Sequence, residues 1–272
     1  MKNIFGMNLD KDELDAKKII LRETDEGLSK QQDDMGEDLE QYAKKATLSG
    51  PLSVLLYISG LLMAICLYVT FVPDEPLWWF LLPAGVFGAI TVVLVICGNV
   101  RRNRVVNSDE FQTALQRSER VAEEARICLG VPADAADIDV FGCAYKIKKG
   151  QVKQGIPGCE FINFSMWMFV EKDHLCLADV GAVYGIPLSS ILRVVRTERK
   201  ITFDDWNKDA PYNKEPYKAF KISKNNNTDI LYMRGYCSVQ FLLDGEECEL
   251  VIPAYDIDPV LCATGLSLTE VV

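Results

Sequence analysis

The chain has a single histidine, His174, and it lacks the motifs that define the common enzyme classes. It contains no Walker loop, no Ser-centred nucleophile elbow and no cluster of metal-ligand residues. Positive charge is also scarce, since 29 Lys and Arg against 39 Asp and Glu give a formal net charge of −10. A nucleic-acid-binding protein would need a basic surface to meet phosphates. The composition therefore predicts no nucleic-acid partner, no metal and no cofactor.

Paired cysteines are missing too, although the chain has 9 cysteines. No two of them form a C-x-x-C pair that could hold zinc or perform redox chemistry. An odd number of isolated thiols is typical of a reducing compartment, where a buried cysteine behaves as a small hydrophobic residue. We therefore expect structural thiols without disulfides.

Ionisable residues are absent from two long stretches, residues 51–72 and residues 77–100. As helices rising about 1.5 Å per residue, both stretches are long enough to cross a hydrocarbon core of about 30 Å. A Pro-Asp-Glu-Pro turn at 73–76 joins them, and aromatic residues flank the turn as in an interfacial belt. A charged segment of some fifty residues precedes the first stretch, so a signal peptide is not expected. Residues 51–100 are thus predicted to form a transmembrane α-hairpin; a buried hairpin in a soluble core is the alternative.

Basic residues flank the two predicted spans on one side only. They are Lys44 and Lys45 before the first span and Arg101, Arg102 and Arg104 after the second, while the turn carries Asp74 and Glu75. Positive charge near span ends stays in the cytoplasm. We therefore expect a two-span protein of the cell membrane with both termini cytoplasmic.

Small residues recur four positions apart in both spans. The pairs are Gly60 with Ala64 and Ala84 with Gly88, a spacing that allows close helix packing. The spacing leaves open whether the helices pack within one hairpin or between copies. Neither span carries a charge, so an ion path within one copy is not expected.

The two flanks are predicted to be cytoplasmic helices. In residues 1–50, Asp10-Lys-Asp-Glu13 resembles a capping box, and apolar residues recur every seven positions from Leu14 to Tyr42. The acidic residues 23–40 form either a solvated face or a docking surface for a basic partner. In residues 101–131, helical spacing begins after Ser108 and ends at Gly130. Pairing of these two helices, or of copies, is expected.

Residues 132–272 change to the alternating pattern of β-strands. Ile162, Phe164, Met166, Met168 and Val170 occupy alternate positions, and Asp244-Gly245 marks a hairpin turn. Further strands are expected near 140–147, 175–178, 183–186, 192–203, 219–223, 229–234, 238–243 and 247–252, with a short closing helix at 256–266. The pattern predicts a bent sheet or small barrel capped by a helix, and hence an α+β membrane protein.

One stretch of this domain is similar to a known family. Residues 169–177, followed by Ile186-Pro-Leu-Ser-Ser-Ile191 and Val194, resemble the bacterial PH-like and GRAM pattern. This resemblance covers residues 138–268 and implies a seven-stranded bent sheet with a C-terminal helix. Glu171 and His174 stand where that family usually has Thr and Arg. The whole chain also resembles two-span bacterial membrane proteins that carry such a domain, a resemblance that implies no activity.

His174 and Cys176 form the only pair that suggests catalysis. Two residues apart on one strand, they share a face, yet their backbones are about 6–7 Å apart, too far for a nucleophile and its base. We expect His174 on the outward face beside a turn, with Leu175 and Leu177 pointing inward.

Two clusters could bind a ligand instead. The first consists of Lys146, Lys148, Lys149 and Lys153, which either meet anionic lipid headgroups or form a solvated surface. The second consists of Trp206, Lys208, Tyr212, Lys214 and Tyr217, which either anchor a protein partner or fold back over a sheet edge.

The sequence therefore predicts a membrane-anchored, non-catalytic scaffold or adaptor. Its expected partners are the lipid bilayer, anionic headgroups and either another protein or a second copy. The alternative is a membrane-bound enzyme with a site near His174 and Cys176 or in residues 206–217.

Overall fold

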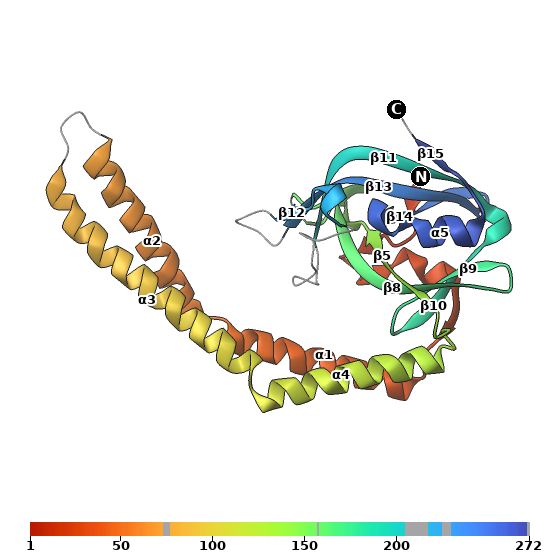
Figure 1. Ribbon diagram of the computed structural model, residues 1–272, viewed down its shortest axis with the longest axis horizontal. Coiled ribbons are helices and arrows are strands. Elements are labelled where there is room, and N and C mark those ends of the chain that lie inside the picture. The colour runs from red at the N-terminus through yellow and green to blue at the C-terminus, as the bar shows by residue number, and fades with distance from the viewer. Residues whose placement is uncertain (73–76, 157, 205–216, 225–229, 271–272) are drawn as a thin grey trace. The chain divides into compact units, whose positions relative to one another are not determined.

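A computed structural model describes residues 1–72, 77–156, 158–204, 217–224 and 230–270. The chain divides into two compact units. The β unit combines residues 1–25 with residues 125–272, and the helical unit comprises residues 26–124. Figure 1 shows the strands gathered in the first unit and the long helices in the second.

Eleven strands of the described residues form one large sheet in the β unit. Its path runs β15-β11-β13-β14-β5-β8-β9-β10-β4, with β1 and β12 added at β14 and β13. The members are β1 (Lys2–Asn3), β4 (Ile20–Glu23), β5 (Ala136–Gly142), β8 (Phe161–Glu171), β9 (His174–Ala178), β10 (Ala182–Pro187), β11 (Ile191–Asp204), β12 (Ser223–Lys224), β13 (Ile230–Leu243), β14 (Glu246–Pro253) and β15 (Leu268–Glu270). The predicted α+β class with a large C-terminal sheet is confirmed.

Five of these strands close into a ring. β11, β13, β14, β5 and β8 follow one another in the sheet, and β8 returns to pair in parallel with β11 at Phe161↔Phe203. Phe141, Phe161 and Phe203 fill this end of the ring, with Phe141 and Phe161 stacked at 5.3 Å between ring centroids. The Asp244-Gly245 turn joins β13 to β14 with φ values of 51° and 85°, as a two-residue hairpin turn requires.

A short helix, α5 (Ile257–Thr264), follows the last long strand, as the pattern at 256–266 predicts. We call the largest cluster of buried apolar residues in the β unit the main core. The helix contributes Ile257 and Val260 to it, together with residues of β13 and β14 such as Val239 and Leu250. Gly265 ends it in the left-handed conformation with φ 67°.

Three strand predictions differ in detail. The strand expected at 140–147 is divided between β5 and β6 (Ala144–Lys148). Of the strand expected at 219–223, the first two residues lie in η4 (Tyr217–Phe220) and only Ser223 lies in a strand. The two strands expected at 229–234 and 238–243 are one continuous β13, with residue 229 outside the described residues.

The first 25 residues do not form the predicted helix. They instead contribute β1, β2 (Met7–Asn8), β3 (Glu13–Leu14), the 3-10 helix η1 (Asp15–Ile19) and β4 to the β unit. β1 pairs with β14, and β4 pairs with β10. Ile4 and Phe5 are buried in the main core, so burial outweighs the weak capping signal at Asp10.

The helical unit contains four long helices among the described residues. They are α1 (Glu26–Ala46), α2 (Gly50–Phe71), α3 (Leu81–Val106) and the greater part of α4 (Asp109–Cys128). A 3-10 turn, η2 (Trp78–Phe80), precedes α3. α4 confirms the helix predicted after Ser108, and α1 confirms a helix in the second half of the N-terminal segment.

α2 and α3 pack directly against each other as a hairpin (Figure 1). The Ser59 and Thr91 hydroxyls are hydrogen-bonded across the interface at 2.9 Å. Ala84 is buried, and the Cα of Gly88 faces the Met63 side chain of α2. The pair Ala84–Gly88 therefore packs within the hairpin, whereas Ala64 is exposed and the space around Gly60 is open.

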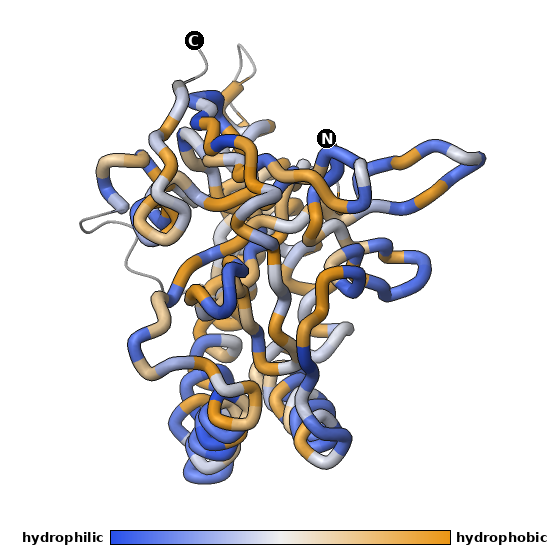
Figure 2. Tube along the Cα trace, turned by 90° about the vertical axis from the view of Figure 1, so that its right-hand side faces the viewer, coloured by the Kyte–Doolittle hydropathy of each residue, from blue (hydrophilic) through white to orange (hydrophobic). Residues whose placement is uncertain are grey.

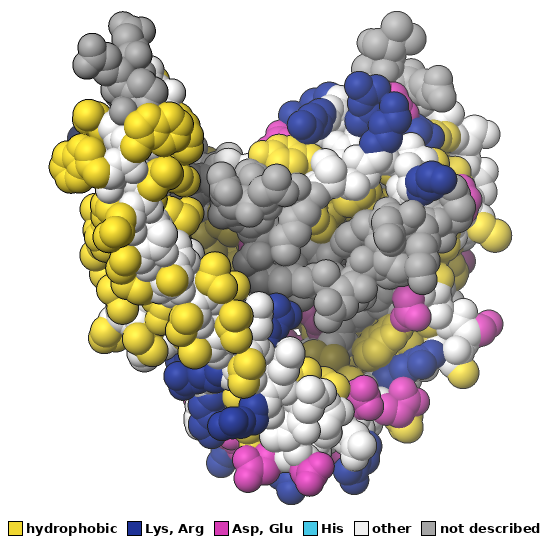
Figure 3. Space-filling view, turned by 60° about the vertical axis from the view of Figure 1, so that its left-hand side comes forward, with side chains coloured by type: hydrophobic (Ala, Val, Ile, Leu, Met, Phe, Trp, Pro, Cys, Tyr) yellow, Lys and Arg dark blue, Asp and Glu magenta, His cyan; other side chains and the backbone are white. Residues whose placement is uncertain are grey.

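The outer faces of this hairpin are apolar and uncovered. The two helices have mean hydropathies of 2.3 and 2.5 over their most apolar windows, of which only 11% is buried. Figure 3 shows hydrophobic side chains covering the hairpin, with Lys and Arg side chains at one end. Both helices are long and apolar enough to span a membrane.

Candidate functional site

The four candidate lysines lie on one β-hairpin. β6 (Ala144–Lys148) and β7 (Gln151–Gln154) pair with Lys146 opposite Lys153 and Lys148 opposite Gln151. These side chains therefore share one face of the ribbon. Lys149 and Gly150 form the turn with φ values of 53° and 73°, the signature of a two-residue turn. We call residues 144–154 the lysine hairpin.

The opposite face of the lysine hairpin is apolar and exposed. Ile147 and Val152 lie directly opposite each other, with 51% and 71% of their surfaces accessible. This pair was not predicted from the sequence, although its alternation with lysines around the Lys149-Gly150 turn was a usable signal. The hairpin thus has one cationic face and one apolar face.

The rest of the β unit holds the lysine hairpin through its first strand, β6. β2 pairs with β6, and the Leu9 N–H donates to the Tyr145 carbonyl at 2.9 Å. The Ile147 N–H donates to Asp10 Oδ2 at 3.1 Å. Residues 147–154 are all exposed. In Figure 2, which colours the trace by hydropathy, hydrophilic segments lie on the outside of the β unit and hydrophobic ones run through its centre.

Most of the aromatic cluster lies outside the described residues. Trp206, Lys208, Tyr212 and Lys214 all belong to 205–216. Tyr217 is described, and its ring meets that of Tyr255 edge-on at 4.9 Å between centroids. Tyr217 itself therefore packs back onto the β unit.

His174 and Cys176 are on one strand but in different environments. His174 follows the Lys172-Asp173 turn, and its Nδ1 lies 2.9 Å from the Lys172 carbonyl. Leu175 and Leu177 point into the main core, as expected. The opposite face of β9, which carries His174 and Cys176, was expected to point outward. At Cys176 this expectation is wrong, because Leu129 and Val131 cover that side chain. Burial raises the pKa of the Cys176 thiol, which disfavours the thiolate that a nucleophile needs.

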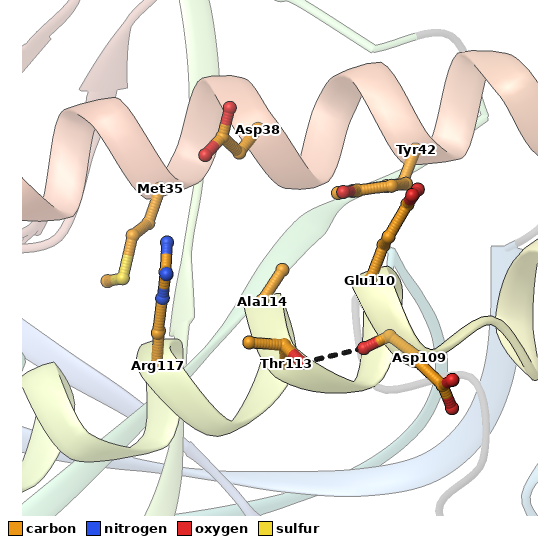
Figure 4. A pocket seen from close by; sticks show the side chains of 8 residues that line it. All are labelled: Met35, Asp38, Tyr42, Asp109, Glu110, Thr113, Ala114 and Arg117. Atoms are coloured by element: carbon orange, nitrogen blue, oxygen red, sulfur yellow. Dashed lines mark hydrogen bonds between the residues drawn. The ribbon is translucent and has the colours of Figure 1, made fainter.

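A groove lies between α1 and α4 in the helical unit. Figure 4 shows Met35, Asp38 and Tyr42 of α1 facing Glu110 and Arg117 of α4. The groove has a volume of about 380 Å³, and the Tyr42 ring in its lining also meets the Phe111 ring of α4 edge-on at 5.7 Å between centroids. The lining of the groove has more acidic than basic side chains, with Asp38, Asp109 and Glu110 against Arg117. This excess of carboxylates would suit a cationic side chain, so docking of a basic partner stays a prediction.

No family model, no curated protein and no solved structure matches this chain.

Proposed function

We propose that this protein is a membrane-anchored, non-catalytic scaffold. In this proposal α2 and α3 insert into the bilayer, both termini lie in the cytoplasm, and the β unit is a PH-like module that binds anionic lipid headgroups through the lysine hairpin.

The exposed apolar surface of α2 and α3 carries the anchor proposal. A helix in the core of a soluble protein hides most of its apolar side chains, whereas here 89% of each apolar window is not buried. At about 25 cal/mol per Å² of apolar surface, leaving both helices in water would cost far more than a typical domain stability. A bilayer removes that cost.

The charge asymmetry supports the orientation. Lys44 and Lys45 end α1, and Arg101, Arg102 and Arg104 lie in the last turns of α3. These five cations are at the same end of the α2–α3 hairpin, because Arg101 Nε donates to the Lys45 carbonyl. Placing that end in the cytoplasm follows from the distribution of Lys and Arg.

The PH-like assignment is supported by the architecture of the β unit. A curved antiparallel sheet that nearly closes on itself and a helix after the last long strand are what the sequence resemblance implies. The strands that residues 1–25 add to the sheet are not part of that expectation.

The two faces of the lysine hairpin support a membrane ligand. Lys146, Lys148 and Lys153 can meet headgroup phosphates, each contributing about 1 kcal/mol near an anionic surface. The exposed Ile147 and Val152 can enter the boundary between headgroups and acyl chains. β-branched residues favour the strand conformation in any hairpin, but Thr would do so without exposing apolar surface to water.

The anchor and its orientation are tested by thiol labelling of intact cells. Cys128 and Cys262 are exposed free thiols. We expect a membrane-impermeant maleimide to label neither of them until the cells are permeabilised. In a variant with Asp74→Cys, the reagent should label the introduced thiol from outside. Labelling of Cys262 in intact cells would overturn the orientation.

The lipid ligand is tested by flotation of a soluble β unit, with residues 1–25 linked to 125–272. Vesicles of phosphatidylcholine with phosphatidylglycerol should bind it at least about tenfold more tightly than phosphatidylcholine alone. Lys148→Gln/Lys153→Gln should abolish most of this preference. The control Lys18→Gln/Lys221→Gln removes the same charge elsewhere and should retain it. Equal recovery with both vesicles would remove the lipid proposal.

A further inference from the structure

A second basic site lies in the helical unit, where α1 ends and α3 emerges from its apolar part. A cavity of about 540 Å³ is lined there by Lys45 of α1 and by Ile96, Cys97, Val100, Arg101 and Arg104 of α3. We call it the basic cavity. In the sequence these cations indicate only the orientation of the spans, and their position in one cavity was not predicted.

Three cations line the basic cavity, and in the described part of the chain none of them has a carboxylate within 4.0 Å. Arg101 is held in place, because its Nε donates to the Lys45 carbonyl at 2.6 Å. The Lys45 Nζ lies 4.9 Å from the centre of the Tyr42 ring. All three are exposed, so their mutual repulsion in water is weak, and an anion placed among them would be attracted by all three.

The other wall of the basic cavity is apolar and continues along α3. Ile96 and Val100 are 54% and 53% exposed, and Val93, one turn before Cys97, is 57% exposed. Residues 93, 97, 100 and 104 follow helical spacing, so a single stripe of α3 passes from apolar to basic. Figure 3 shows this change of side-chain type at the end of the hairpin.

We infer that the basic cavity binds one anionic phospholipid, with its phosphodiester between Lys45, Arg101 and Arg104 and an acyl chain along Val93, Ile96 and Val100. This inference rests on the proposed membrane insertion of α2 and α3. A lipid fits better than a free phosphate, because the phosphodiester and the acyl chain of one molecule match the basic and the apolar parts of the same stripe of α3. Basic pockets beside membrane helices on the cytoplasmic side suit such headgroups.

The structure supplies a matched control for the test. Lys44 and Arg102 neighbour Lys45 and Arg101 in sequence but do not line the basic cavity. The variant Lys45→Gln/Arg104→Gln and the control Lys44→Gln/Arg102→Gln therefore remove equal charge from the same end of the hairpin. A third variant, Cys97→Trp, fills the cavity and keeps all the charges.

The experiment titrates the full-length protein in neutral detergent with phosphatidylglycerol, phosphatidylcholine and glycerol 3-phosphate, and reads bound lipid by native mass spectrometry. Phosphatidylglycerol should bind at least about tenfold more tightly than phosphatidylcholine, and glycerol 3-phosphate should not compete. Lys45→Gln/Arg104→Gln and Cys97→Trp should each weaken binding about tenfold, and the control should change it less than about twofold.

Equal weakening by the test and control variants would overturn the inference, since it would indicate diffuse surface attraction. Competition by glycerol 3-phosphate would overturn the lipid as the occupant. Carbonate extraction of native membranes separates this inference from the proposed function. Protein that stays in the membrane but shows no lipid preference would overturn the basic cavity alone, whereas release into the supernatant would overturn the anchor and the cavity together.

Discussion

Burial changes the acidity of several single side chains in the β unit. It raises the pKa of the thiols of Cys143, Cys159 and Cys237 to about 11. All nine cysteines lie in the described residues and are free. The sequence-based expectation of structural thiols is consistent with these three environments, because a thiol that stays protonated at neutral pH is a poor nucleophile.

Asp256 should make the stability of the β unit depend on pH. Burial raises the pKa of the Asp256 carboxyl group from 3.8 to about 7. The hydrogen bond that its Oδ2 accepts from the Asp139 N–H at 2.7 Å lowers the pKa, but by less than burial raises it. Between about pH 4 and pH 7 the folded protein keeps this proton while the unfolded chain releases it. The free energy of unfolding should therefore fall by about 3 kcal/mol as pH rises through this range, and stay level above it.

The measurement is urea unfolding of the full-length protein in detergent, followed by the circular dichroism of the β-sheet. Asp256→Asn should flatten the dependence on pH. Asp244→Asn, at the exposed β13–β14 turn, is the control and should leave the dependence as in the wild type. A wild-type protein that gains stability from pH 4 to pH 7 would contradict the prediction.

At the scale of the element, small side chains and a polar contact hold the α2–α3 hairpin together. Ser59 and Thr91 supply the contact, and Ala84 and Gly88 allow the helices to approach closely. Lipid and apolar side chains attract a helix almost equally, so such close packing has to provide the stability of the pair.

Gly88→Leu should destabilise the hairpin by about 1–3 kcal/mol. A Cβ at this position would lie 3.2 Å from Met63 Sδ, so the larger side chain would push the helices apart. Gly85→Leu is the matched control, because nothing lies within 4 Å of a Cβ there. Thermal unfolding in detergent should show a lower Tm for Gly88→Leu only. An equal loss in both variants would mean that Gly85 also faces a partner.

On the scale of the whole molecule, the β unit is assembled from two parts of the chain separated by the helical unit. Residues 1–25 supply Ile4, Phe5, Ala16 and Ile19 to the main core. Fully burying each large apolar side chain contributes about 1.5–3 kcal/mol. Three such residues contribute an amount comparable with the net stability of an ordinary domain.

A fragment of residues 125–272 should therefore fail to fold cooperatively. A fragment that links residues 1–25 to 125–272 should show a single thermal transition by circular dichroism. Addition of a synthetic peptide of residues 1–25 to the shorter fragment should restore part of that transition. Equal Tm values for the two fragments would show that the N-terminal residues are dispensable.

Several elements could be read from the sequence because their signals are local. The uncharged runs at 51–72 and 77–100 predict helices, and the alternation from Ile162 to Val170 predicts β8. The Asp244-Gly245 turn is equally local, since its dihedral angles suit few other residue pairs. For the candidate sites, the lysines of the lysine hairpin were visible but its exposed Ile147–Val152 pair and the basic cavity were not.

Hydropathy along the chain was by itself sufficient to determine the two helices long and apolar enough to span a membrane and most strands that follow residue 160, because the length of an apolar run and its period depend on neighbouring residues alone. Tertiary structure decided that residues 1–25 complete the sheet, that β8 and β11 close the ring, and that Lys45 meets Arg101 and Arg104. These contacts join residues far apart in the chain, and the free energy that favours them comes from packing and charge in three dimensions, which no local pattern contains.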